Sequence, residues 1–270
     1  MAKTKGNKTI WAPIFVTLGV LALIGAWYLL AFCLASNGNY GVPYPHETAS
    51  LAFSYLFLEG ALGTWMAIFW TLLRLVMGFV VSFVLGALFG ILAGLFPKFK
   101  AFSSPLLGVL RAIPTAAVVL TLVSVLLGAK AHAWLSWIPV ALTFVVAFPL
   151  YYQAFCSGIE NESADILDSL SLEGANRKFA TLVQVYLPDS WPFISMSLAQ
   201  SLGLSFKVCI MAEVLSATSA GKAGIGTLIV LSRQADGGIQ AIPAYSLIVL
   251  ILMAVLDIPF LILRKKRKTK

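Results

Sequence analysis

The stretch ENESADILDSLSLEGANRKFATLVQVYLP, residues Glu160–Pro188, is the one long polar interruption between strongly apolar segments of this 270-residue chain. Asn161 is suited to cap a first short helix, because its side chain can accept a hydrogen bond from a free backbone N–H. Gly174 favours the end of that helix, since glycine takes the left-handed C-terminal conformation without steric cost. Asn176 can cap a second helix, and Pro188 is expected to exclude the helical conformation at the residue before it. The sequence therefore predicts two short amphipathic helices joined at a glycine hinge.

Composition places the rest of the chain in a lipid bilayer. Hydrophobic residues make up 60% of the sequence and charged residues 11%, against about 25% charged in soluble domains. Apolar segments long enough to cross a bilayer recur along the chain. We expect a single all-α, polytopic membrane domain, residues 10–263, between a cytoplasmic N-terminus at 1–9 and a basic tail at 264–270. Its expected spans are at about residues 10–33, 66–95, 104–128, 134–156, 190–213 and 242–263.

The polar stretch resembles the EAA loop of the membrane subunits (permeases) of binding-protein-dependent ABC importers. That pattern runs Glu-Ala-Ala, three residues, Gly-Ala, then a hydrophobic residue and Leu-Pro. None of the Glu-Ala-Ala triplet is kept here, and the spacing from the glycine to Leu-Pro is one residue longer. The resemblance implies that residues 160–188 form a cytoplasmic coupling loop that contacts an ATPase. The residues at the matching positions are Asp168, Ser169, Leu170, Gly174, Ala175, Leu187 and Pro188.

Three further motifs extend this resemblance over most of the chain, in particular to permeases of the nitrate/sulfonate/taurine class. The first is Ser/Thr-Leu-x-Arg-x-x-x-Gly-Phe, matched by Thr71, Leu72, Arg74, Gly78 and Phe79. The second is Arg-x-Ile-Pro, matched by Arg111, Ile113 and Pro114. The third is Ala-Glu followed by Gly-x-Gly-x-Leu-Ile, matched by Ala212, Glu213, Gly224, Gly226, Leu228 and Ile229. The resemblance implies a type I ABC importer permease fold with about six transmembrane helices.

Small residues recur on one face of the second span. An i, i+4 run of glycines permits close packing against a neighbouring helix. The residues are Gly78, Gly86, Gly90 and Gly94. A loop of polar and small residues is expected between the fifth and sixth spans, at residues 215–240.

Polar and helix-breaking residues within the spans are candidates for the translocation pathway. Pro114 lacks the amide that a helix needs, so it predicts either a simple kink or a broken helix beside a cavity. A charged residue in mid-bilayer costs about 2.5–3.5 kcal/mol, so Lys207 and Glu213 are expected either to anchor their span or to contact solute. Their six-residue separation makes them poor partners for each other. The candidates are Arg111, Pro114, Thr115, Gln200, Ser201, Ser205 and Lys207.

Lysine and arginine are distributed unevenly about the spans. Thirteen of the nineteen lie in the N-terminus, beside Lys98, in the 160–188 loop or in the tail. The loops on the opposite side hold three, Lys130, Lys222 and Arg233. Cytoplasmic loops carry an excess of such residues, so both termini and the 160–188 loop are expected in the cytoplasm. The net charge of +8 is explained in this way, without a nucleic-acid partner.

The sequence offers little for catalysis. It contains no G-x-x-x-x-G-K-[ST] nucleotide-binding motif, and its two histidines, His46 and His132, are isolated. We therefore expect no catalytic residue, metal site or cofactor on this chain, and a membrane-embedded enzyme is disfavoured. A secondary transporter or channel that needs no ATPase is the remaining alternative. Its signature would be intramembrane acids suited to ion coupling, or an inverted repeat.

The family resemblance also implies partners. These are a dimer of cytoplasmic ABC ATPases that bind ATP and Mg²⁺, a second permease copy in a homodimer or heterodimer, and an external solute-binding protein. The expected location is a bacterial inner membrane, and the expected solute is small and anionic.

Overall fold

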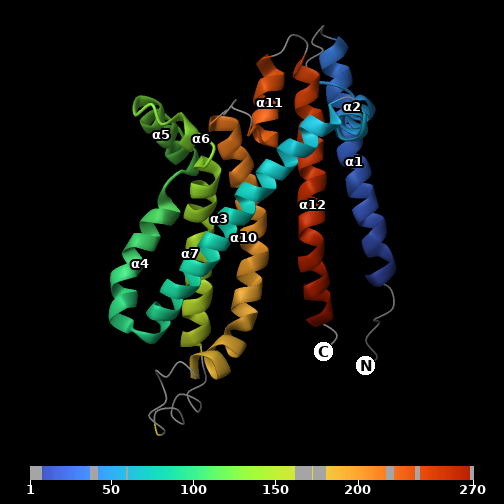
Figure 1. Ribbon diagram of the computed structural model, residues 1–270. Helices are drawn as coiled ribbons and strands as arrows, with labels where there is room; N and C mark the ends of the chain where they lie inside the picture. The colour runs from blue at the N-terminus through green and yellow to red at the C-terminus, as the bar shows by residue number, and fades with distance from the viewer. Residues whose placement is uncertain are drawn as a thin grey trace, which may run out of the picture.

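The computed structural model describes residues 8–36, 42–58, 60–161, 172, 181–216, 222–234 and 238–267. Regular structure within these ranges is entirely helical (Figure 1), which confirms the all-α expectation. The elements are α1 (Lys8–Ser36), α2 (Pro45–Phe57), α3 (Ala61–Leu95), α4 (Pro97–Ala112), α5 (Thr115–Gly128), α6 (His132–Leu135), α7 (Ile138–Glu160), a π-helical turn (Leu182–Tyr186), α10 (Leu187–Ser216), α11 (Ile225–Gln234), a 3-10 turn (Gly238–Gln240) and α12 (Ala241–Arg267).

Five of these helices are long and apolar enough to cross a membrane: α1, α3, α7, α10 and α12. The pair α4 and α5 makes a sixth candidate span, bent by 87°. The bend follows from Pro114, because a proline disfavours the helical conformation at the preceding residue. Ile113 accordingly takes extended backbone angles, φ −70° and ψ 125°. The polytopic expectation is confirmed, and Pro114 divides two helices rather than kinking one.

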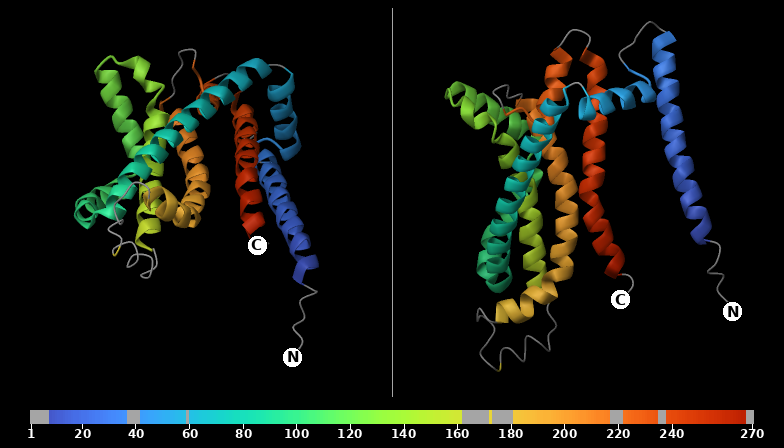
Figure 2. Two further views of the ribbon diagram at one scale, coloured as in Figure 1. Left: turned by 60° about the horizontal axis from the view of Figure 1, so that its bottom comes forward. Right: turned by 45° about the vertical axis from the view of Figure 1, so that its right-hand side comes forward.

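The first and the last of the described helices have their outer ends on one side of the helical bundle. The N-terminal end of α1 and the C-terminal end of α12 are at the bottom of Figure 1, and so are the end of α7 and the start of α10. The short helices α2 and α11 lie at the opposite side. The helix α1 stands at the edge of the bundle next to α2 (Figure 2). The described residues that flank the 160–188 loop are therefore on the same side as the start of α1 and the end of α12.

The centre of the bundle is a close contact between α3 and α7. The glycines predicted to permit such packing all face α7, where an added Cβ would have no room. At Gly86 it would lie 2.5 Å from the Cβ of Tyr151, and at Gly90 it would lie 2.6 Å from the carbonyl oxygen of Tyr152. Gly78 and Gly94 meet Thr143 and Ile159 in the same way. The predicted small-residue face is confirmed.

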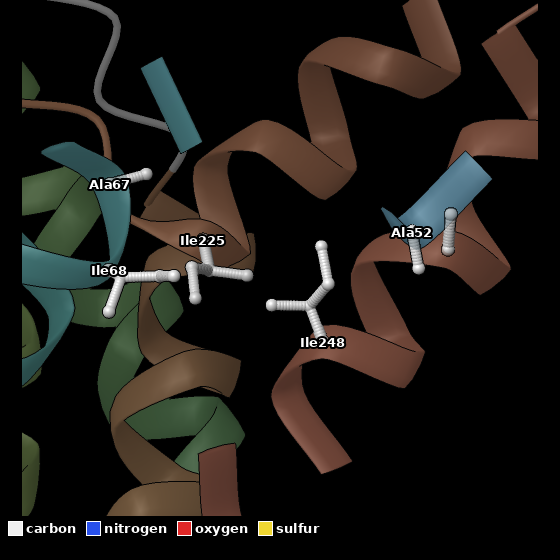
Figure 3. Packing of buried hydrophobic residues seen from close by; sticks show 6 residues of the cluster. Ala52, Ala67, Ile68, Ile225 and Ile248 are labelled. Carbon is white, nitrogen blue, oxygen red and sulfur yellow. The ribbon is translucent and has the colours of Figure 1, made fainter. Parts of the chain in front are cut away.

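A second apolar contact joins helices from both ends of the sequence. Residues of α2, α3, α11 and α12 form one buried cluster, which Figure 3 shows from close by. Its members are Ala52, Ala67, Ile68, Ile225, Ala244 and Ile248. This cluster holds α12 and the short helices against the upper part of α3. α10 contacts α3 near Leu75, and α7 packs along the glycine face between Gly78 and Gly94.

Two expectations about helix limits were wrong. Leu187 is helical and begins α10, with Pro188 in the first turn. The π-helical turn Leu182–Tyr186 runs directly into α10, and such local π adjustments let a membrane helix accommodate a proline that cannot donate a hydrogen bond. Residues 215–240 are not a plain loop, since they contain α11. Its sequence, IGTLIVLSRQ, is short and was obscured by the glycines that precede it.

Candidate functional site

Three neighbouring cavities open along one side of α7. They measure about 340, 260 and 400 Å³, and Gln153 lines all three. The first lies against α10, the second against α4, and the third is enclosed by α4, α5, α7 and α10. We call these cavities together the furrow. Its main polar lining residues are Lys100, Ser104, Arg111, Thr115, Gln153, Ser157, Glu160, Asn161, Ser197 and Gln200.

Within a largely apolar lining, the furrow carries polar groups from a stripe on α7 and from the residues opposite it. Gln153, Ser157 and Asn161 follow one another at four-residue spacing, which places them on one helix face. Ser197 and Gln200 of α10 line the same cavity. Polar side chains on a membrane-spanning helix are expected to face protein or water rather than lipid. The furrow is therefore a surface on which a polar solute can be held.

Arg111 projects its charge into the furrow from the last turn of α4. Its Nη2 donates hydrogen bonds to the carbonyl oxygen of Pro149, at 3.0 Å, and to Oε1 of Gln153, at 2.6 Å. The guanidinium lines two of the three cavities. Arg111 is separated by two residues from Pro114, so the break between α4 and α5 lies beside it. The helix break and the charge thus occur at one place.

The structure brings some of the other pathway candidates to the furrow and places the rest elsewhere. Thr115 lines the same cavity as Arg111, and Gln200 lines the cavity beside α10. Ser201 is fully buried and donates to the hydroxyl of Tyr151 at 2.6 Å. The remaining candidates line none of the three cavities: Pro114 at the start of α5, buried Ser205, and exposed Lys207. The coupling candidates Asp168, Ser169, Leu170, Gly174 and Ala175 lie outside the described residues, whereas Leu187 and Pro188 begin α10.

An exposed ion pair lies at the end of the furrow nearest the 160–188 loop. Nζ of Lys100 lies 2.5 Å from Oε1 of Glu160 and 2.7 Å from Oε2. The pair joins the first turn of α4 to the last residue of α7. Both side chains are more than a third exposed, so water screens the pair and it contributes about 0–1 kcal/mol.

A second ion pair is buried at the opposite end of the bundle. Nη1 of Arg74 in α3 lies 2.7 Å from Oε1 of Glu213 in α10, and each side chain is 1% exposed. The other carboxylate oxygen accepts hydrogen bonds from the hydroxyl of Thr71, at 2.8 Å, and from the backbone N–H of Gly226, at 3.1 Å. Nη2 of Arg74 donates to the carbonyl oxygen of Lys222. Such a pair is tolerated because every charged group in it is hydrogen-bonded.

This cluster also fixes the start of α11. The backbone N–H of Ile225 donates to the Thr71 hydroxyl at 2.9 Å, next to the bond from Gly226 to Glu213. The first N–H groups of a helix lack intrahelical acceptors, and here side chains of α3 and α10 supply them. An acid at a helix N-terminus is further favoured by the helix dipole. The first and third of the sequence motifs therefore meet at one buried polar cluster.

Comparison with known proteins agrees with the family resemblance of the two motifs that meet in this cluster. The model of the family described as "Binding-protein-dependent transport system inner membrane component" matches residues 84–266, more than half of the chain. The chain belongs to this family. It is therefore a permease, a membrane transport subunit rather than an enzyme, and it crosses the membrane several times.

Curated relatives support the family assignment. A "putative aliphatic sulfonates transport permease protein" of Bacillus subtilis is 26% identical over 193 residues, 69% of this chain and 63% of the relative. A "probable ABC transporter permease protein" of Brucella melitensis is 28% identical over 197 residues, 73% of this chain and 74% of the relative. The matched part thus spans less than two thirds of the Bacillus relative's length.

Gly224→Ala should destabilise the permease by about 1–3 kcal/mol, the usual cost of forcing extra atoms into a packed site. An added Cβ at Gly224 would lie 2.0 Å from Oε1 of Glu213, where the carboxylate is held by its bonds to Arg74 and Thr71. The measurement is the midpoint of unfolding of the purified protein in mixed detergent micelles. Gly108→Ala on α4 is the matched control, because nothing lies within 4 Å of its added Cβ. Equal midpoints for the two variants would contradict the prediction.

Two important features of this permease were not predicted from its sequence. Arg74 was named in a motif, but its pairing with Glu213 was not predicted, although the two residues carry opposite charges within spans. Gln153 was not noticed, because a single glutamine in an apolar helix carries no signal of its own. Its four-residue spacing to Ser157 and Asn161 was the pattern that could have revealed it.

Proposed function

We propose that this permease forms, with a second permease subunit, the membrane pathway of an ATP-driven importer for a small anionic solute. The observation that carries the proposal is the furrow, where an arginine and several amides line one side of a membrane-spanning helix. Facing lipid, these groups would lose their hydrogen bonds to water, each at a cost of several kcal/mol. A second permease subunit placed over the furrow would enclose it as a polar path between two subunits.

Coupling to ATP hydrolysis is assigned to the 160–188 loop. The helix ends that flank this loop, at Glu160 and Leu187, lie on the same side as the start of α1 and the end of α12 (Figure 1). Among the described residues, that side includes Lys8, Lys98, Lys100 and residues 264–267, and because cytoplasmic segments carry an excess of lysine and arginine, we assign this side to the cytoplasm. A separate pair of ABC ATPases with ATP and Mg²⁺ would contact the loop there. The proposed contacts are Asp168, Ser169, Leu170, Gly174, Ala175, Leu187 and Pro188.

The solute is proposed to be a small oxyanion, delivered by an external binding protein. The Bacillus relative is named as a permease for aliphatic sulfonates, which makes sulfonates the first class to test. Selection among anions is assigned mainly to the binding protein, and the furrow supplies a path that accepts negative charge. No cofactor of this chain's own is part of the proposal.

Gly174→Trp should uncouple the importer. A bulky residue at the hinge would displace one of the two predicted helices from the ATPase groove, because a helix seated in a groove depends on its register. Transport in proteoliposomes should fall by about tenfold, equivalent to about 1.4 kcal/mol, while ATP hydrolysis by the same preparation continues. The assay uses the permease co-purified with its ATPase and supplied with its binding protein.

Gly63→Trp is the control for this change. Gly63 lies on an exposed part of α3, and nothing lies within 4 Å of its added Cβ. Unchanged coupling in Gly174→Trp would count against the coupling role of the loop. A permease that purifies from detergent extracts without any ATPase would favour the secondary transporter or channel instead.

A further inference from the structure

We propose that the guanidinium of Arg111 is the anion-binding group of the furrow, and that Gln153 is the residue that positions it. The inference rests on the proposed function, since the anion would be the transported solute. It goes further by naming the group that binds the anion and the residue that orients this group. Neither the family match nor the relatives' names assign a role to either residue.

The charge of Arg111 is not balanced by the part of the chain that the structure describes. There, carboxylates pair with Arg74 and with Lys100. Arg111 bonds instead to a backbone carbonyl and an amide oxygen, which are both neutral. An arginine within a membrane segment costs about 2.5–3.5 kcal/mol unless water or an opposite charge compensates it. The furrow admits either, so the charge is available to an anion.

The geometry leaves two donor nitrogens of the guanidinium free for a ligand. Both hydrogen bonds to Pro149 and Gln153 use Nη2. Among the described residues, Nη1 and Nε have no acceptor. They lie on opposite edges of the guanidinium, because each two-donor edge also includes Nη2, so each can donate its own hydrogen bond to a ligand oxygen. A hydrogen bond from such a charged donor to an oxygen of a carboxylate, sulfonate or phosphate is roughly twice as strong as a bond between neutral groups. The two cavities that Arg111 lines measure about 260 and 400 Å³, which is enough for a small oxyanion.

Gln153 holds the guanidinium without neutralising it. Its Oε1 accepts from Nη2 at 2.6 Å, which fixes the side chain's direction while leaving its net charge intact. A glutamate at the same position would have nearly the same shape but would form an ion pair with Arg111. Gln153→Glu therefore removes the available charge while it keeps the contact, and this separates an anion site from a purely structural hydrogen bond.

The test uses a reporter cysteine in the cavity of Arg111. Thr115→Cys is made in the full-length permease with Cys33, Cys156 and Cys209 replaced by alanine, and its reaction with neutral N-ethylmaleimide is followed by intact-protein mass spectrometry. The probe is methanesulfonate, and neutral dimethyl sulfone is its matched control. At a probe concentration ten times above its Kd, mass action predicts that methanesulfonate slows the reaction about tenfold. Dimethyl sulfone should leave the rate unchanged.

Variants then identify the group responsible. Arg111→Gln and Gln153→Glu should each abolish the protection, and Arg111→Lys should keep part of it. Gln240→Glu is the control, since it adds the same charge at an exposed position outside the three cavities, and protection should persist. Equal protection by dimethyl sulfone, or full protection in Arg111→Gln, would overturn the proposal.

Two further comparisons distinguish a solute site from a lipid site, and anion binding from coupling. A lipid phosphate could bind the same guanidinium, so the reaction is repeated in lipid-free detergent and in phosphatidylglycerol nanodiscs. Protection by methanesulfonate in both supports a solute site, whereas its loss in nanodiscs would identify a lipid site and overturn the proposal. The reaction needs no ATPase. Loss of coupling to an ATPase would therefore refute the proposed function without affecting this result, and absent protection would refute the anion site alone.

Discussion

Glu213→Gln is expected to lower the free energy of unfolding of this permease by about 3–5 kcal/mol, the cost of leaving a buried charge without its partner. Glutamine keeps an oxygen for the hydroxyl of Thr71 and the N–H of Gly226, so the change removes mainly the negative charge. Arg74, 1% exposed, would then keep its positive charge in a site closed to water. The measurement is reversible unfolding of the purified protein in mixed detergent micelles.

Two comparisons make this result specific. Glu160→Gln removes the same charge from the exposed pair with Lys100 and should change stability by about 0–1 kcal/mol. The double variant Arg74→Met with Glu213→Gln should recover part of the loss, because no charge then remains buried. A double variant that loses the sum of both single effects would show that the pair is not energetically coupled.

Gly90→Leu should destabilise the contact of α3 with α7 by about 3 kcal/mol or more, the upper end of the usual cost of overpacking. An added Cβ would lie 2.6 Å from the carbonyl oxygen of Tyr152 and 2.8 Å from the Cβ of Phe155. Backbone atoms cannot rotate away as the end of a side chain can, so the helices would have to separate. The expected result is a large fall in the unfolding midpoint and in the yield of monodisperse protein.

Gly108→Leu on α4 is the control for this change. It makes the same substitution in a membrane-associated helix where nothing lies within 4 Å of the added Cβ, and it should be tolerated. If Gly90→Leu were tolerated equally well, the close contact of α3 with α7 could not have the importance that the structure gives it.

Much of the fold follows from the sequence because a bilayer permits few solutions. Backbone polar groups must be satisfied within each span, so long apolar segments become helices. The glycine face of α3 was predictable for a similar reason, since small residues at i and i+4 admit another helix. An interruption of the helix at Pro114 was also predicted, but the sequence did not decide between a kink and a broken helix.

The long-range pairings could not be foreseen. Local helical spacing shows that Glu213 and Lys207 do not face each other, but it cannot identify Arg74, which is 139 residues away. The role of Gly224 is similarly hidden, because its small size is required by a carboxylate from another helix. In the furrow, Arg111, Thr115 and Gln200 were singled out by residue type, while Gln153, which connects the cavities, was visible only once α4, α7 and α10 were placed together.

The glycine face of α3 has a consequence for how this permease can move. Ser82 is also fully buried. With it, the small residues Gly78, Gly86, Gly90 and Gly94 recur every four positions, a spacing of about 6 Å along the helix axis. Two helices packed in this way can shift along each other only by one full four-residue repeat. The helix pair α3 and α7 therefore has discrete relative positions, and smaller movements must take place in the helices packed around it.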